Sequence, residues 1–178
     1  PGNLLEIKNN FANGEPVIYL KNASHELIVE PASMVILINC DNITVASVTA
    51  QNNSHGIYVI GGSRNSFHNS NFSNNRYGIY LNGEEGISRN NSIINNICNS
   101  KSYGIYLSDV DNTKVSGNIC SQNEIGIYLD GTEGFSRNNT FINNICNSNN
   151  YGIYLSNIDD TNVSSNICSE NGNGIVID

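Results

Sequence analysis

Residues 104–125 read Gly104-Ile-Tyr-Leu-Ser-Asp-Val-Asp-Asn-Thr-Lys-Val-Ser-Gly-Asn-Ile-Cys-Ser-Gln-Asn-Glu-Ile125, which is one period of an internal repeat. The opening Gly-Ile-Tyr-Leu phrase returns, with small changes, at positions 56, 78, 104, 126, 152 and 174. The intervals between these starts are 22, 26, 22, 26 and 22, and the doubled units 78–125 and 126–173 are identical at 33 positions. A fixed period of this length is the signature of a solenoid.

The period and the residue types together predict strands. Helical-hairpin repeats need about 33 residues or more, and the framework of leucine-rich repeats is missing. Ile, Val, Tyr, Asn and Gly dominate and favour short strands and turns. At roughly 3.3 Å per strand residue, one period suits a three-sided coil. We therefore predict an all-β, right-handed parallel β-helix with three strands per coil and about seven coils of 22 or 26 residues, the longer coils carrying four extra residues in one loop.

The period also divides the chain. Residues 1–33 lack it and are expected to form an irregular first coil or cap, with a strand over 27–29. Regular coils of the same single domain are expected over 34–178, beginning with Met34-Val-Ile-Leu37, one short period before Gly56. The chain opens on Pro-Gly-Asn and stops inside a strand-like Gly-Ile-Val-Ile-Asp. We expect it to be a piece of a longer protein.

Aligned coils give columns of like residues. Two apolar columns are predicted to fill the interior: Val45, Phe67, Ile93, Val115, Phe141 and Val163, and Ala50, Phe72, Cys98, Cys120, Cys146 and Cys168. Stacked Asn side chains can hydrogen-bond from coil to coil. Two Asn ladders are therefore expected, the second interrupted by Lys101: Asn96, Asn118, Asn144 and Asn166, and Asn53, Asn75, Asn123, Asn149 and Asn171.

Phrases such as Val115-Ser-Gly-Asn-Ile-Cys-Ser-Gln-Asn123 resemble the parallel β-helix repeat of NosD-like proteins, a group that overlaps the carbohydrate-binding and sugar-hydrolase β-helix class. Residues 13–22 and 34–45 resemble the N-terminal part of archaeal NosD-like surface proteins. The resemblance implies an extracellular or cell-surface location and a carbohydrate partner. The fold itself hosts lyases, epimerases, adhesins and plain scaffolds, so it does not assign an activity.

Composition excludes several classes of partner. The net charge is −8 with eight Lys plus Arg, so the chain lacks the basic stripe that nucleic acids or anionic membranes require. No apolar run approaches the roughly 20 residues of a membrane span, and no stretch of the sequence has the pattern of a signal peptide.

The Tyr of each repeated phrase is expected to point outward and to stack with its neighbours along one face: Tyr58, Tyr80, Tyr106, Tyr128 and Tyr154. Such a column is either a platform on which sugar rings lie or a stack that only stabilises the sheet. Matched insertions over 82–90 and 130–138 are expected to project beside it. They bring Glu85 with Arg89, and Glu133 with Arg137, either to a glycan or into local ion pairs of solvated loops.

Catalysis would need acidic calcium ligands and a base, as in polysaccharide lyases. The candidates for calcium are weak: Asp109 and Asp111, with Asp159 and Asp160 one doubled unit later. Lys114 lies near the first pair, but Asn162 replaces it in the second. Because an active site usually interrupts a repeat, this duplication argues against catalysis.

Each Cys of the second apolar column follows an Ile, and the two must face opposite ways in a strand. If the thiols point inward as small hydrophobes, the exposed residues are Ile97, Ile119, Ile145 and Ile167, an apolar stripe that could contact another chain. The reverse orientation stays open. Free thiols are expected, and zinc is not, because no CxxC spacing exists and a linear column cannot surround a metal tetrahedrally.

No cofactor is expected. Copper needs clustered His, Cys or Met, whereas His25, His55, His68 and the single Met34 fall in different columns.

The leading hypothesis is a non-catalytic cell-surface scaffold that binds polysaccharide along its tyrosine column. The alternatives are a polysaccharide lyase, epimerase or glycosidase domain, and a purely structural envelope or self-association module.

Overall fold

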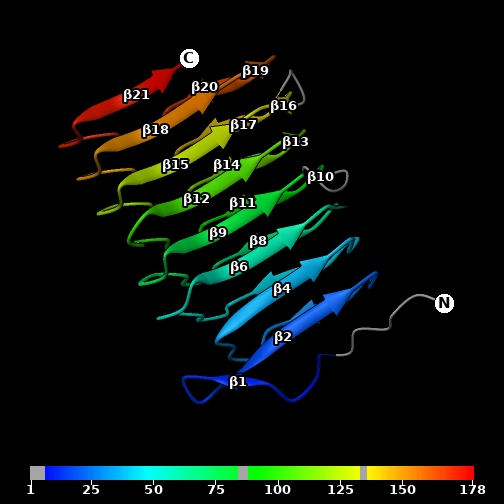
Figure 1. Cartoon of the computed structure of the whole chain (residues 1–178). Helices are drawn as coiled ribbons and strands as arrows, with labels where there is room; N and C mark the ends of the chain where they lie inside the picture. The colour runs from blue at the N-terminus through cyan, green and yellow to red at the C-terminus, as the bar shows by residue number, and fades with distance from the viewer. Residues whose placement is uncertain (1–6, 84–87, 133–135) are drawn as a thin grey trace.

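The computed structural model describes residues 7–83, 88–132 and 136–178, which form coils stacked along one axis (Figure 1). One side of the stack is a nine-stranded sheet in which every pairing is parallel except that of β1 with β2. Its strands, in spatial order, are β1 (Phe11–Ala12), β2 (Glu15–Lys21), β4 (Met34–Ile38), β6 (His55–Ile60), β9 (Tyr77–Asn82), β12 (Tyr103–Ser108), β15 (Ile125–Asp130), β18 (Tyr151–Ser156) and β21 (Asn173–Ile177).

The other sides carry shorter strands. A parallel seven-stranded sheet contains β3 (Leu27–Ile28), β5 (Thr44–Ala46), β8 (Ser66–His68), β11 (Ser92–Ile94), β14 (Lys114–Ser116), β17 (Thr140–Ile142) and β20 (Asn162–Ser164). Two-residue strands at the corner between the sheets pair as β7 (Gly62–Ser63), β10 (Ser88–Arg89) and β13 (Val110–Asp111), and as β16 (Ser136–Arg137) with β19 (Ile158–Asp159). Each coil from β6 to β20 has three strands, as predicted.

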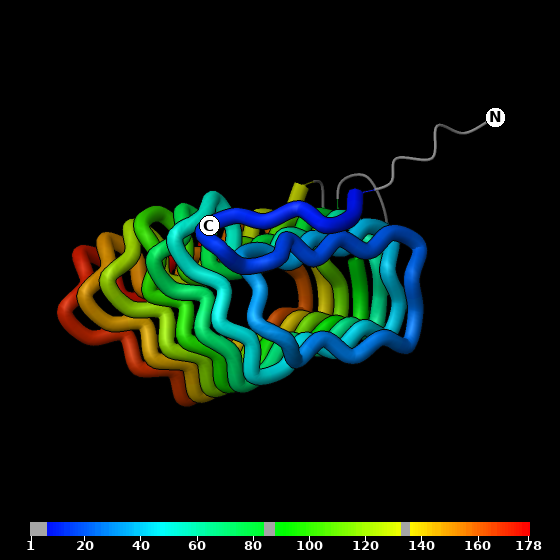
Figure 2. The backbone as a smooth tube through the Cα atoms, turned by 90° about the horizontal axis from the view of Figure 1, so that it is seen from below, coloured from blue at the N-terminus to red at the C-terminus, as the bar shows by residue number. Residues whose placement is uncertain are grey.

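The register confirms the period. Within the described residues, successive pairings of the long strands connect Val35, Ile57, Ile79, Ile105, Ile127, Ile153 and Ile175, so each strand lies one short or one long period from the next. A shorter first step, from Val17 to Met34, precedes them. The regular turns are therefore one fewer than the seven expected. Seen from below, successive coils follow similar paths, each displaced sideways from the one before (Figure 2).

The interior is filled by the predicted columns. Val45, Phe67, Ile93, Val115, Phe141 and Val163 are in register across the seven-stranded sheet. Ile and Leu of each repeated phrase are fully buried in the four coils from residue 78 to 155. Burial of each such side chain contributes roughly 1.5–3 kcal/mol. Cys98, Cys120 and Cys146 are buried as well, so the inward orientation of the thiols is confirmed.

Buried Asn side chains join consecutive coils at the bends. Asn118 Oδ1 accepts a hydrogen bond from the Asn96 backbone N–H at 2.9 Å, and Asn118 Nδ2 donates to the Ile93 carbonyl at 2.9 Å. Asn118 Nδ2 also donates to Asn144 Oδ1 at 3.0 Å, which links the amides themselves. The same pattern continues through Asn144 to Asn166. The predicted ladder therefore supplies partners for backbone groups that a bend would otherwise leave unpaired.

The second predicted ladder is continuous where Lys101 was expected to interrupt it. The backbone N–H of Ser100 donates to Asn123 Oδ1, and Ser100 Oγ donates to the Phe72 carbonyl at 3.4 Å. Ser100, which directly precedes Lys101, thus takes the place of an Asn. A column drawn at constant period contains Lys101 and not Ser100, so the sequence did not predict this ladder residue.

A third ladder was not predicted. Asn65 Oδ1 accepts from the Ile43 N–H, and Asn91 Oδ1 accepts from the Asn65 N–H, both at 2.9 Å. Thr113 stands in the column before Asn139 and donates its N–H to Asn139 Oδ1 at 2.9 Å. Thr113 interrupts the run of Asn in this column, which weakens the repeat signal in the sequence.

Asn has a second role at the corners. In the part of the chain that the structure describes, Asn accounts for most of the positive-φ residues other than Gly. Asn tolerates the left-handed conformation better than most residues because its short polar side chain bonds locally. Asn69, Gly117 and Asn143 occupy equivalent corners, which shows that Gly and Asn substitute for each other there.

The Gly of each repeated phrase allows coils to approach closely. A Cβ built on Gly104 would lie 2.5 Å from the Gly126 carbonyl oxygen and 2.9 Å from Cys120 Cβ. The last Gly of the column, Gly174, would meet nothing nearer than 3.6 Å. Glycine is therefore required inside the stack and dispensable at its C-terminal end.

Replacement of Asn118 by Ala should lower the free energy of unfolding by about 2–5 kcal/mol, because it leaves several buried backbone and amide groups without hydrogen-bond partners. Urea denaturation followed by circular dichroism measures this loss. The exposed Asn150→Ala serves as the matched control and should change stability little. Equal effects of the two substitutions would contradict the ladder's role.

Replacement of Gly104 by Ala should destabilise the fold by about 2–3 kcal/mol, because the new methyl group overlaps backbone of the next coil. Gly174→Ala should be close to neutral. Thermal melts of both variants test the difference, and a Gly104→Ala variant as stable as Gly174→Ala would rule out the close approach.

Candidate functional site

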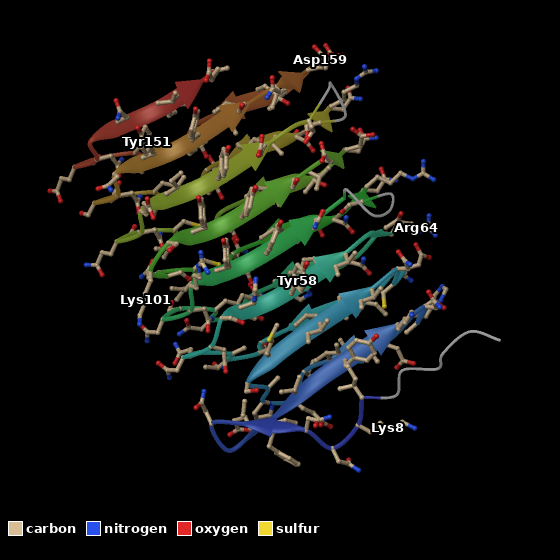
Figure 3. All side chains as sticks on the ribbon, viewed as in Figure 1. Lys8, Tyr58, Arg64, Lys101, Tyr151 and Asp159 are labelled. Carbon is tan, nitrogen blue, oxygen red and sulfur yellow. The ribbon has the colours of Figure 1, made fainter. Side chains whose placement is uncertain are left out.

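The tyrosines predicted to stack do so. Strand register aligns Tyr58, Tyr80, Tyr106, Tyr128 and Tyr154. Successive ring centroids are 5.2, 4.6, 5.0 and 5.2 Å apart. The spacing follows the separation of about 4.7–4.9 Å between neighbouring strands. These side chains are partly exposed on the outer face of the nine-stranded sheet, on which Figure 3 labels Tyr58 and Tyr151.

A second aromatic column lies beside the first and was not predicted. It consists of His55, Tyr77, Tyr103 and Tyr151, with Ile125 in place of a ring. Tyr77 stacks on Tyr103 at 5.2 Å and on Tyr80 of its own strand at 5.5 Å. Strict alternation would turn Tyr77 inward with Ile79, but Gly78 and Ile79 are both buried, which breaks the alternation and leaves Tyr77 partly exposed. The recurring aromatic residue before Gly was the available signal.

We call the combined surface the tyrosine face: His55, Tyr58, Tyr77, Tyr80, Tyr103, Tyr106, Tyr128, Tyr151 and Tyr154. Its central rings are nearly parallel, with interplanar angles of 12° for both Tyr80–Tyr106 and Tyr106–Tyr128, whereas Tyr58 is tilted by 37° from Tyr80. Each inner ring therefore has its two faces covered by its neighbours. A sugar ring cannot lie flat on such a ring, as the platform hypothesis required, and would meet its edge and hydroxyl instead.

Polar side chains line one border of the tyrosine face. Strand register places Asn82, Ser108, Asp130 and Ser156 in one column, two positions after the first tyrosine column. The Tyr154 hydroxyl donates a hydrogen bond to Asp178 Oδ2 at 3.3 Å. On the other border, the Arg76 guanidinium lies 5.4 Å from the centre of the Tyr77 ring. The face is thus rich in neutral hydrogen-bonding groups.

Three phenols in the middle of this face, Tyr103, Tyr106 and Tyr128, resist ionisation. Burial, reinforced by Asp130, raises the pKa of Tyr128 to about 12. Burial also raises the pKa of Tyr106 and of Tyr103, with neighbouring phenols adding to the effect. Burial and the Arg76 charge lower the pKa of His55. At neutral pH the hydroxyls of Tyr103, Tyr106 and Tyr128 are therefore protonated and can donate as well as accept hydrogen bonds.

The candidate charged loops are only partly described. Glu85 and Glu133 lie outside the described residues. Arg137 Nε is 3.7 Å from Asp159 Oδ2, and Arg89 is in register with Asp111. Both arginines thus belong to a ladder of short strands that follows the long strands, at the edge where Figure 3 labels Arg64 and Asp159.

The calcium candidates are engaged in the fold. Asp109 Oδ1 accepts from the Thr132 N–H, and Asp111 Oδ1 accepts from the Arg137 N–H at 3.0 Å. Asp159 pairs with Arg137, and Asp160 sits at a corner with φ of 45°. Within the ranges that the structure describes, no three His, Cys, Asp or Glu side chains form a group that could hold a metal ion.

The predicted isoleucine stripe is exposed. Ile97, Ile119 and Ile167 have exposed fractions of 38, 37 and 52%, and Ile145 is intermediate. The four residues form consecutive parallel bridges, so they make a straight apolar line whose side chains point away from the buried thiols.

A search of the described residues finds no helix with the length and apolar character that a membrane crossing requires.

A parallel β-solenoid with an unbroken inner stack defines the class of protein. The family model described as "Right handed beta helix region" matches residues 33–178, and the chain therefore belongs to the right-handed β-helix family. This match also confirms the predicted handedness. No curated protein sequence matches the chain.

Two solved structures are similar to it in fold. One is the A-module of the mannuronan C-5 epimerase AlgE4 of Azotobacter vinelandii, with 9% identity, a TM-score of 0.40, and coverage of 87% of this chain and 53% of that one. The other is the tailspike protein gp49 of Acinetobacter baumannii bacteriophage Fri1, a capsular polysaccharide depolymerase, with 12% identity, a TM-score of 0.27, and coverage of 84% and 42%. The chain spans about half the length of these structures.

The raised phenol pKa values predict a loss of stability at high pH. An unfolded tyrosine ionises near pH 10, whereas Tyr128 keeps its proton in the fold to about pH 12. Its contribution to stability is fully present below pH 10 and is lost as the pH rises toward 12. Urea midpoints measured at pH 8 and pH 11 should therefore differ.

The double variant Tyr106→Phe, Tyr128→Phe should lose less stability over this pH interval, because two of the ionising groups are gone while the rings remain. An identical decrease in the parent and the variant would show that these phenols do not titrate with folding.

Proposed function

We propose that the protein is a non-catalytic β-helix scaffold that binds neutral polysaccharide along the tyrosine face through hydroxyl groups and ring edges. The observation that carries the proposal is the continuous column of partly exposed tyrosine rings over five consecutive coils, with a second column of rings beside it that Ile125 interrupts. Stacking alone would stabilise the sheet, each pair contributing about 0.5–1.5 kcal/mol. The polar border argues for a further role, because it places the partly exposed Asn82, Asp130 and Ser156 beside the phenols of three coils.

The chemistry of the face suits a chain of hydroxyl groups. Protonated phenols can donate to and accept from sugar hydroxyls, as can the partly exposed Asn82 and Ser156 of the border. The coils repeat these groups at strand spacing, so an extended chain lying across them meets the same chemistry several times. Repetition of weak contacts along one ligand raises affinity without any single strong site.

Charge favours neutral over acidic polysaccharides. The net charge of the chain is −8, and Asp130 lies on the border of the face. Arg76, on the opposite border, already contacts Tyr77. A polyanion would meet net repulsion, whereas a neutral chain would not.

Two finer points belong to the same proposal. The resemblance to NosD-like archaeal surface proteins favours a cell-surface or extracellular location, where polysaccharides are abundant. In this proposal the isoleucine stripe contacts a second copy of the protein or another envelope protein.

Binding to immobilised neutral and acidic polysaccharides tests the proposal. The double variant Tyr106→Phe, Tyr128→Phe keeps the ring stack and removes two hydroxyls. It should weaken binding to the best neutral polysaccharide about tenfold, because each lost hydrogen bond is worth about 0.5–1.5 kcal/mol.

The control variant, Ser116→Ala with Ser164→Ala, removes two hydroxyls from the seven-stranded sheet and should bind like the parent. Unchanged binding by the tyrosine variant, or no binding to any polysaccharide, would refute the role of the face. Release of reducing ends or of unsaturated uronates from the same panel would refute the non-catalytic assignment.

A further inference from the structure

The first turn of the solenoid is shorter than the second, so part of the second turn has no neighbouring coil on that side. The chain passes from Ile28 to Met34 in the first turn, whereas the equivalent path in the next coil runs from Val45 to Gly56 and is nearly twice as long. The segment around Thr49–Asn52 therefore has no equivalent in the first turn. Thr49 forms a bridge with Asn71 of the following coil, and it has no bridge to the preceding coil in the part of the chain that the structure describes.

This mismatch leaves a hollow of about 230 Å³ on the outside of the first two coils. Two small apolar residues line part of it, and the polar lining comes from Asn13, Glu15, Ser33, Thr49, Gln51 and Asn52. The volume lies below the range of about 300–1,000 Å³ that is typical of drug-sized ligands. It suits one small polar molecule rather than an oligosaccharide.

The walls are fixed by hydrogen bonds. Asn13 Nδ2 donates to the Asn52 carbonyl at 3.1 Å and ties the N-terminal hairpin to the second coil. Asn53 Nδ2 donates to the carbonyls of Ser33 and Gln51, both at 2.7 Å. The hollow is therefore built by three segments that are distant in sequence and held together, which is the arrangement of a pre-formed site.

One group in the lining lacks a protein partner. Ser33 is 2% exposed, and its hydroxyl makes no hydrogen bond within the described protein. A buried hydroxyl left unpaired costs about 1–3 kcal/mol. Such a group calls for an explanation, and a ligand hydroxyl in the hollow would supply the missing hydrogen bond.

We propose that this hollow binds a single neutral sugar ring, at a site separate from the tyrosine face. Amides, hydroxyls and one carboxylate are groups that donate to and accept from neighbouring sugar hydroxyls. Among the described residues of the lining, Glu15 alone is charged, so anionic sugars are disfavoured. A single carboxylate also falls short of the acidic ligand set that calcium usually takes.

Chemical shifts of the backbone amides of the whole chain, recorded during titration with glucose, galactose, mannose and N-acetylglucosamine, test the proposal. At least one of these sugars should shift the amides of residues 49–53 and 13–15. Glu15→Ala should weaken that sugar about tenfold, because a hydrogen bond to a charged group is lost. Ser33→Ala should also weaken it without lowering stability, since the unpaired hydroxyl is removed. The exposed Glu30→Ala is the matched control and should bind like the parent.

The variant Tyr106→Phe, Tyr128→Phe should bind the monosaccharide normally, which separates this proposal from the one for the tyrosine face. The proposal is overturned if no neutral sugar shifts these amides, if only glucuronate or calcium chloride does so, or if Glu15→Ala binds as tightly as the parent.

Discussion

The structure depends on coil-to-coil hydrogen bonding by buried Asn side chains at the bends. A strand satisfies its own backbone through the sheet, but a bend breaks that pattern inside a closed interior, where unpaired groups are costly. Asn96, Asn118 and Asn144 resolve this by accepting from a backbone N–H of the coil before and donating to a carbonyl of that coil. Each such pair of bonds is possible at only one register. The ladders therefore fix which residues become vertical neighbours, and every column on the surface follows from them.

The tyrosine face is a consequence of that fixed register. Parallel strands in register bring identical side chains to the spacing of the strands, so the phenol rings must stack and cover one another's faces. What remains for a partner is a set of ring edges and hydroxyls beside a polar border. A face built for stability can thus also present repeated hydrogen-bonding chemistry, whereas flat stacking of sugars on its inner rings is sterically closed. The hollow near Ser33 arises in the opposite way, where one short turn departs from the repeat.

The sequence predicted most of the fold because residues at the same position of each repeat have the same structural surroundings. The period alone predicts the long strands and the Phe67, Cys120 and Tyr106 columns. Failures came where local structure overrides alternation or constant spacing. The buried Gly78 breaks the alternation beside Tyr77, and Ser100 replaces an Asn one position earlier than the period requires. The carboxylates of Asp109 and Asp111 were weak calcium candidates in the sequence, but in the structure both accept hydrogen bonds from backbone donors of the next coil. Such pairings depend on loop paths that a linear pattern does not contain.

The central claim is that residues one period apart in the sequence are bonded neighbours in consecutive coils. Scalar couplings across hydrogen bonds, measured by NMR on isotope-labelled protein, test it most directly. The structure predicts couplings from the amides of Cys98, Cys120 and Cys146 to the carbonyls of Ile119, Ile145 and Ile167, respectively. Observation of these three pairs would establish the register. Couplings to carbonyls displaced by one or more positions, or couplings confined to residues close in sequence, would contradict it.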